Sequence, residues 1–328
     1  MNQTMTTATT PVTNPNVTRS RLVLEIASEM AGGAAADAVP DYILPKVELR
    51  HSRGGKPVTF SGVSSAEGIF AVAAREIDLA MINPAAVLSV ALRGQGIFKQ
   101  PMPVRAIAVI PSWDAFVFAV RPETGLTRFE DIAAQKPKLR ILMRATPDHS
   151  LHHMFDDVAA AAGFSRDDIA RWGGEVRKSG SVPWPYTETF KALIRGDVDA
   201  IFDEAAHSWV PQALDAGIAI LPLAETTVAR LEAMGYRRAV LPKSAYPKLP
   251  RDVLSLDFSG WTVFVHAEAD DALVTQICMG LDARKARIPW EEPGALPVER
   301  MAREALDTPQ CVPLHPAAER FWRSRGYL

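Results

Sequence analysis

The sequence has little cysteine, no long apolar run and no excess of one charge. Its 328 residues include only two cysteines, which lie far apart, so neither a disulfide framework nor zinc-ribbon spacing is present. The 36 basic and 38 acidic residues give a formal charge of −2, and this balance gives no reason to expect nucleic acid as a partner. No apolar run approaches the length of a membrane span. The class that we expect is a globular protein with a sizeable core.

The first residues also lack what an export signal needs. Residues 1–18 contain neither Lys nor Arg and no apolar segment, and they are rich in Thr, Asn and Pro. A signal peptide requires a positively charged start and an apolar stretch. We therefore expect a disordered tail over 1–18, and a cytoplasmic location for the chain as written. A start further upstream would instead allow a periplasmic location.

Short apolar runs alternate with segments of helical spacing from residue 21 onward. The runs expected to form strands include 21–27, 47–51, 77–82, 104–111, 139–143, 198–202 and 261–265. Repeated strand–helix alternation is typical of α/β proteins with largely parallel sheets. Extended segments near 112–120 and 221–226 could carry the chain between two lobes. We therefore predict one lobe from residues 19–114 plus 225–328, and a second lobe from residues 115–224.

The loop of residues 144–150 lies between a predicted strand and a predicted helix and is the main candidate for a binding site. Thr146 or Asp148 is the expected N-cap of the helix. Backbone N–H groups at a helix N-terminus favour an anion, and Arg144 adds a guanidinium suited to a carboxylate or phosphate. The loop therefore predicts one wall of a small-molecule cleft, although an ordinary junction with a solvated Arg fits these residues equally well. The ligand contacts expected here are Arg144, Thr146, His149 and Ser150.

Residues after other predicted strands could face the same cleft, because ligands in open α/β sheets bind outside the carboxyl ends of the strands. Glycines after the first run would let the backbone approach a ligand closely. Asn83 follows the run at 77–82 directly. Its role could also be limited to capping the next helix. The further contacts that we expect are Ser28, Gly32, Gly33, Asn83 and Glu204, with Trp209 as an apolar wall.

Two clusters have spacing that would allow metal binding or acid/base chemistry. His149 and His153 would share one face of a helix and could hold a divalent ion, but the inner Glu of the H-E-x-x-H motif is missing. Histidines that lie on the helix surface or hydrogen-bond a ligand are the favoured interpretation. The second cluster comprises Asp203, Glu204 and His207. These side chains could exchange protons or simply line a cleft.

Other motifs that would mark an enzyme are missing. There is neither a dinucleotide fingerprint nor a nucleophile elbow. We predict no catalytic residue, no metal and no cofactor, and we favour a binding protein over an enzyme.

Several segments resemble, in order and spacing, the TAXI group of TRAP-transporter solute-binding proteins. These segments are the Gly-Gly turn at 32–33, the run Glu-Ile-Asp-Leu-Ala-Met-Ile-Asn at 76–83, the paired strands at 105–110 and 116–121, Phe-Glu-Asp-Ile at 129–132, Asp-Val-Asp-Ala at 197–200 and the closing segment 313–322. The resemblance covers most of residues 21–328. It implies a two-lobed, periplasmic-binding-protein-like (type II) fold that closes by a hinge around a ligand.

The resemblance also implies a function, which is capture of a small anionic organic ligand of the carboxylate type in the cleft between the lobes. The partners would be this small-molecule anion and, after export, the membrane subunits of a TRAP transporter. Members of the group normally carry an export signal and small residues in the loop at 144–150, and this chain differs in both respects. The alternative is therefore a cytoplasmic lyase on the same fold, such as a decarboxylase of an aromatic acid. His149 and Glu204 would then be acid/base candidates, with or without a metal.

Overall fold

The computed structural model describes residues 15–32, 45–50, 55–62 and 65–328. The chain divides into two compact units, Met1–Val47 and Glu48–Leu328, and each is described by itself.

The first unit contains one long helix, α1 (Pro15–Gly32), where a strand was expected at 21–27. The prediction of a strand is wrong because a short apolar run fits either structure, and good helix formers such as Leu, Glu, Ala and Met surround this one. Residues 15–18, predicted to be disordered, belong to the same helix, and the rest of the predicted tail lies outside the described residues.

The second unit contains two five-stranded sheets. The first sheet has the order β1-β2-β3-β12-β4 and is formed by β1 (Lys46–Leu49), β2 (Val58–Ser61), β3 (Leu79–Ile82), β12 (Trp261–His266) and β4 (Val104–Ile110). Strand β2 runs parallel to β3, whereas β12 is antiparallel to both β3 and β4. The last strand of the chain therefore lies between two strands made much earlier.

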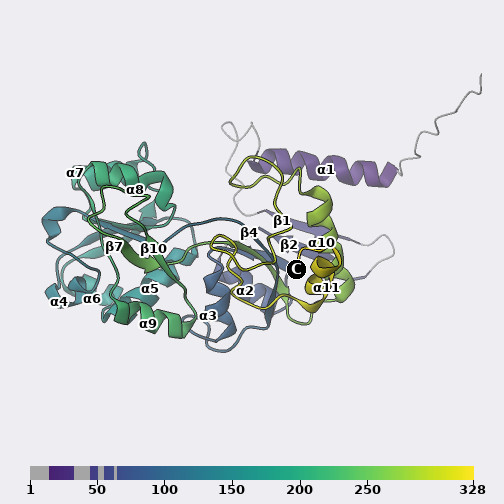
Figure 1. The fold of residues 1–328 in the computed structure, drawn as a ribbon, viewed down its shortest axis with the longest axis horizontal. Helices are drawn as coiled ribbons and strands as arrows, with labels where there is room; N and C mark the ends of the chain where they lie inside the picture. The colour runs from purple at the N-terminus through teal and green to yellow at the C-terminus, as the bar shows by residue number, and fades with distance from the viewer. Residues whose placement is uncertain (1–14, 33–44, 51–54, 63–64) are drawn as a thin grey trace, which may run out of the picture. The chain divides into compact units, whose positions relative to one another are not determined.

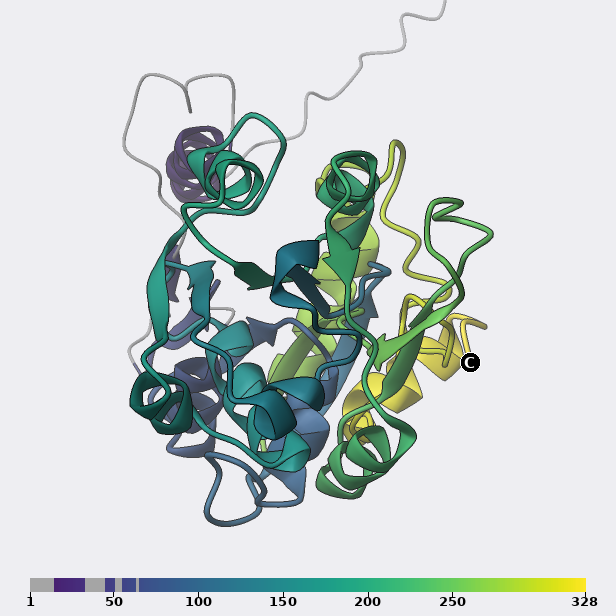
Figure 2. The ribbon, with the colours of Figure 1, turned by 90° about the vertical axis from the view of Figure 1, so that its left-hand side faces the viewer.

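Helices cover both faces of the first sheet. They are α2 (Ala66–Ala73) and α3 (Ala86–Leu92) on one face, and α10 (Asp271–Arg284) and α11 (Pro316–Ser324) on the other. Alternate residues of a strand point to opposite faces, so Val263 and Val265 pack with α10 and α11, and Phe264 packs with the other core. Figure 1 and Figure 2 show the end of the chain, marked C, beside the yellow helix α11.

The second sheet has the order β7-β6-β8-β5-β9. Its strands are β5 (Val117–Val120), β6 (Arg140–Arg144), β7 (Glu175–Gly180), β8 (Ala200–Asp203) and β9 (Ala219–Ile220). Strand β6 runs parallel to β7 and β8, and β5 is antiparallel to β8 and β9. Both sheets are thus mixed, where the sequence predicted largely parallel sheets, and the antiparallel strands β5 and β12 are the first strands after each crossing of the chain between the sheets.

The remaining elements lie after β5 in sequence and before β12. They are η1 (Pro122–Thr124), α4 (Asp131–Gln135), α5 (Ser150–Ala162), α6 (Arg166–Arg171), α7 (Glu188–Arg195), α8 (Ala206–Asp215), α9 (Glu225–Met234) and the antiparallel pair β10 (Arg238–Leu241) and β11 (Val253–Leu256). Helix α9 packs against α5, and Leu241 and Val253 share a core with Trp209 of α8. Helices α5 and α9 accordingly lie close together in Figure 1. The predicted lobe boundaries stay a prediction.

Two short segments connect the sheets, residues 111–116 after β4 and residues 257–260 before β12. They run antiparallel and are bonded to each other: the N–H of Phe258 donates to the carbonyl of Asp114 over 3.0 Å, and the N–H of Gly260 donates to the carbonyl of Ser112 over 2.9 Å. We call this pair of segments the hinge pair. A connection of this kind allows two packed bodies to rotate about a narrow axis.

The architecture is a mixed α/β fold with two sheets joined by two connecting segments, in agreement with the two-lobed α/β fold that the resemblance implied. Within the described residues, no helix combines the length and the apolar character needed to cross a membrane.

Candidate functional site

The centre of the candidate site is a buried cluster of one arginine and three carboxyl groups. Arg144 is the last residue of β6, and its guanidinium forms ion pairs with Asp203, at the end of β8, and with Glu204 in the following loop. Only 11% of the Arg144 side chain and 1% of the Asp203 side chain are exposed. Because β6 and β8 are parallel neighbours, their carboxyl ends bring these residues together.

The third carboxyl group belongs to Asp114, in the hinge pair, which is hydrogen-bonded to Glu204. Burial and the negative charge of Glu204 raise the pKa of Asp114 well above its usual range. Burial also acts to raise the pKa of Glu204, but the charge of Arg144 and the hydrogen bond from Asp114 outweigh it and lower that pKa. Within this pair Asp114 therefore holds a proton more tightly than Glu204 does.

Two polar atoms of the cluster have no partner in the described part of the chain. These are Nε of Arg144 and Oδ2 of Asp203, and both are buried. Burial raises the pKa of Asp203 to about 7, against the effect of the Arg144 charge. A buried polar atom without a hydrogen bond is costly and marks a place where a ligand or water would be stabilised.

The helix that follows the loop at 144–150 is α5, and its N-cap is His149 rather than Thr146 or Asp148. The N–H of Leu151 donates to Nδ1 of His149 over 3.3 Å, and Nε2 of the same ring lies 3.3 Å from Nη1 of Arg144. Burial, followed by the charge of Arg144, lowers the pKa of His149 to about 3, so the ring is neutral at pH 7. The ring stacks in parallel on Phe258 of the hinge pair, with 6.5 Å between centroids.

Two predicted contacts, Asn83 and Ser150, are used to join elements of the two sheets. The hydroxyl of Ser150 donates to the carbonyl of Asn83 over 2.7 Å. The side-chain amide of Asn83 donates to the carbonyls of Phe258 and Gly260, over 3.0 Å and 3.3 Å. Asn83 is not a helix cap, because Ala85 holds that position for α3. In this conformation both side chains hold elements of the two sheets together, and neither polar group is left for a ligand.

Other predicted residues lie away from the cluster or serve it indirectly. Trp209 is fully buried, so it forms no apolar wall; its indole N–H donates to the carbonyl of Glu204 over 2.7 Å and fixes that backbone. Thr146 is half-buried in its loop and His207 is exposed on α8. Ser28 lies within α1, so the turn after a strand that suggested its role does not exist. Gly32 ends that helix, and Gly33 lies outside the described residues.

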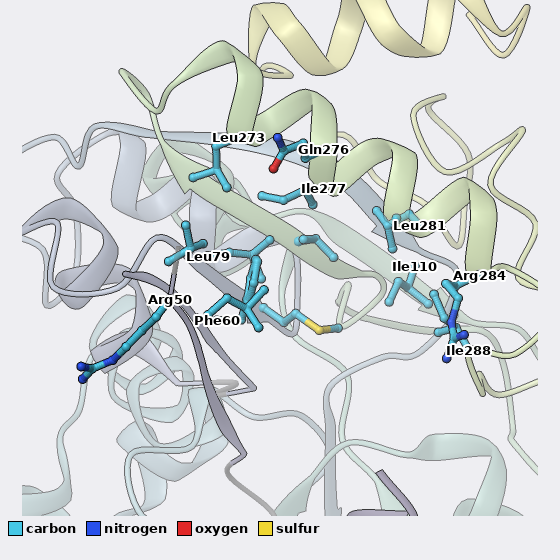
Figure 3. A pocket seen from close by; sticks show the side chains of 15 residues that line it. Arg50, Phe60, Leu79, Ile110, Leu273, Gln276, Ile277, Leu281, Arg284 and Ile288 are labelled. Atoms are coloured by element: carbon cyan, nitrogen blue, oxygen red, sulfur yellow. The ribbon is translucent and has the colours of Figure 1, made fainter. Parts of the chain in front are cut away.

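A separate apolar cavity of about 680 Å³ lies over the first sheet. Figure 3 shows Leu273, Ile277 and Leu281 of α10 facing Leu79 and Phe60 of the strands. Its polar lining residues are Arg50, Gln276 and Arg284, and it includes none of the predicted site residues. Ligand sites combine an apolar lining with a few convergent polar groups, and the convergent polar groups of this protein lie in the Arg144 cluster instead.

One histidine of the run at 149–153 supports the loop at 144–150. His152 Nε2 donates to the carbonyl of Arg144 over 2.8 Å, so this ring supports the loop. In the residues that the structure covers, no group of three or more His, Cys, Asp or Glu side chains is arranged to hold a metal ion.

Comparison with known proteins identifies a family. The sequence matches the NMT1-like family over residues 53–326. No curated protein matches the chain.

Among solved structures, the alkanesulfonate-binding protein SsuA from Xanthomonas axonopodis pv. citri, bound to MOPS, is 18% identical with a TM-score of 0.33; the match covers 66% of this chain and 58% of that one. A protein from Xanthomonas citri bound to ATP is 10% identical, with a TM-score of 0.41 and 79% of each chain covered. The arginine-, lysine- and histidine-binding protein ArtJ from Geobacillus stearothermophilus is 10% identical, with a TM-score of 0.30, covering 66% of this chain and 69% of that one. This chain thus spans less than two thirds of the length of SsuA.

Proposed function

The chain belongs to the NMT1-like family, and from its two-sheet fold and its buried charged cluster we propose that it binds a small organic solute between the two sheets. The observation that carries the proposal is the pair of unpartnered buried atoms, Nε of Arg144 and Oδ2 of Asp203. They lie at the carboxyl ends of neighbouring parallel strands, which is where α/β sheets bind ligands.

We further propose that the ligand is a small organic anion of the carboxylate type. Arg144 is the group suited to it, because a guanidinium binds a carboxylate through two parallel hydrogen bonds. In the present structure the Arg144 guanidinium already forms ion pairs with Asp203 and Glu204. A ligand carboxylate would therefore compete with two side chains of the protein, and protonation of Asp203 would favour the ligand.

The proposal includes a partner, the membrane subunits of a TRAP-type transporter. It rests on the resemblance of the sequence to TAXI solute-binding proteins and requires export of the chain. The hinge pair supports it, since a solute-binding protein of this kind must open to release its ligand.

The test is a thermal-shift screen with acetate, succinate and benzoate, because a molecule that binds only the folded state raises the midpoint of unfolding. Arg144→Lys keeps the charge but loses the bidentate geometry, so we expect the Kd of the best acid to rise at least tenfold. The matched control is Arg140→Lys on the same strand. The guanidinium of Arg140 pairs with Asp199 at a distance of 2.7 Å, and this pair does not belong to the Arg144 cluster. If no acid shifts the midpoint, or if both variants bind equally, the carboxylate proposal is wrong.

A second candidate function is a lyase acting on an aromatic acid, and the carboxyl groups are what favour it. Asp203, with its pKa raised to about 7, lies beside Glu204, whose pKa is lowered. Pairs of carboxyl groups with separated pKa values are typical of acid/base catalysis. Release of carbon dioxide from dihydroxybenzoates, abolished in Asp203→Asn, would support a lyase, whereas binding without turnover would support the solute-binding protein.

A further inference from the structure

Asp114 is the point where the hinge pair meets the binding loop. Its side chain is buried, and its backbone is bonded in both directions to the opposite segment of the hinge pair. The N–H of Asp114 donates to Oγ of Ser259 over 3.1 Å, and its carbonyl accepts from the N–H of Phe258 over 3.0 Å. Any rotation at the hinge pair therefore displaces Asp114.

The carboxyl group of Asp114 holds the loop that carries Glu204. Oδ2 accepts from the N–H of Ala205 over 2.6 Å, and Oδ1 accepts from the N–H of Ala206 over 2.9 Å. These N–H groups open helix α8, whose N-cap residue, Ala205, has no side chain able to cap it. A residue that lies far away in the sequence thus supplies the cap.

The loop at this point has an unusual backbone. Ala205 adopts the left-handed conformation, with φ of 60°, which residues other than glycine rarely adopt. The surrounding contacts must hold such a conformation in place, and one of them is the hydrogen bond from the N–H of Ala205 to the Asp114 carboxyl. The Asp114 carboxyl is also hydrogen-bonded to Glu204, which pairs with Arg144.

We propose that Asp114 is a positioning residue that couples the ligand site to the hinge, so that a change at Glu204 alters the angle between the two sheets. This inference rests on the proposed function, because the coupling would link binding of the solute to closure of the two sheets around it. The coupling itself is a property of the protein without ligand and can be measured there.

The experiment measures the distance between spin labels on the two sides of the hinge, without any ligand. Exposed positions are available on α2 and α7, so the labels are attached through Glu67→Cys and Lys191→Cys, in a background with Cys278→Ser and Cys311→Ser. Glu204→Gln then perturbs the site from one side. We expect this change to shift or broaden the distance distribution when Asp114 is present, and to leave the distribution unchanged in Asp114→Ala.

The matched control is Ser259→Ala, which removes a contact to the backbone of Asp114 but not to the loop, so Glu204→Gln should still shift the distribution. If Asp114→Ala does not fold, Asp114→Asn replaces it, because its amide nitrogen cannot accept from Ala205; the shift should then fall by at least half. An equal shift with and without the Asp114 carboxyl, or no shift in either background, would overturn the inference. Since no ligand is used, a failed acid screen would refute the carboxylate proposal alone.

Discussion

At the scale of single residues, the stability of the protein should depend on Arg144 much more than on its neighbour Arg140. Arg144→Ala would leave Asp203 and Glu204 buried without a counter-charge, and removing one partner of a buried ion pair costs about 3–5 kcal/mol. Arg140→Ala is the control, since the Arg140 side chain is 37% exposed and ion pairs of exposed side chains contribute within about 1 kcal/mol. Urea unfolding measures the free energy of unfolding of both variants. Similar losses in the two variants would show that the Arg144 cluster is solvated.

The pH dependence of stability should carry a contribution from Asp203. Its pKa is raised from 3.8 to about 7 in the folded protein, so between these values the folded state binds more protons than the unfolded state. The stability that this group contributes is therefore complete below pH 4 and is lost as the pH rises through 7.

Asp203→Asn removes this contribution. The free energy of unfolding of the variant, relative to the unmodified protein, should therefore rise between pH 4 and pH 7. Asp199→Asn is the control without such a rise, because the hydrogen bonds from Arg140 lower the pKa of Asp199 from 3.8 despite its burial, so the stability contributed by Asp199 is lost only as the pH falls below this value. A relative stability of Asp203→Asn that does not change with pH would mean that Asp203 is ionised throughout this range.

Sequence reasoning brought Arg144, His149 and Glu204 to one place, because it relied on the carboxyl ends of parallel strands. It missed Asp114, since nothing in the local sequence shows that this carboxyl caps a helix beginning at Ala206. Polar side chains such as Asn83 can bind a ligand or a carbonyl of the chain, and only the three-dimensional contacts decide which.

At the scale of elements, the glycine of the hinge pair should tolerate no side chain. Gly260 has φ of 79°, and a Cβ there would lie 2.7 Å from Cγ1 of Val109. Gly260→Ala should therefore lower the free energy of unfolding by roughly 1–3 kcal/mol. Gly280 lies inside α10 with nothing within 4 Å, so Gly280→Ala should raise it by about 0.5–1 kcal/mol. Chemical denaturation measures the free energy of unfolding of both variants. If Gly260→Ala changes it in the same way as Gly280→Ala, the backbone at residue 260 can relax.

Elements with a clear boundary signal or a continuous apolar run could be predicted from the sequence, and elements without either could not. Helix α7 shows such boundary signals, since Thr187 caps it and Gly196 ends it in the left-handed conformation. Strands β2 and β11 were missed, because Thr59 and Ser255 interrupt their short apolar runs. The run at 21–27 was assigned to a strand because its apolar residues fit both periods.

At the scale of the whole molecule, ligand exchange should require the two sheets to separate. Ser65, before α2, and His149, before α5, are paired as an isolated antiparallel bridge. Facing residues of this kind are close enough for a disulfide. We expect Ser65→Cys/His149→Cys, once oxidised, to lose binding of the best acid at least tenfold and to regain it on reduction, as measured by calorimetry. His149→Cys alone is the control, and equal affinity in both redox states would show that entry needs no opening here.

The position of β12 between β3 and β4 also has a consequence for how the chain is made. During translation, β3 and β4 leave the ribosome long before the strand that joins them. At about 5–20 residues per second, the delay from Ile110 to Trp261 is on the order of ten seconds. Throughout this time the edges of both strands can pair with other nascent chains. The first sheet is therefore the part of this protein that a chaperone would have to protect during synthesis.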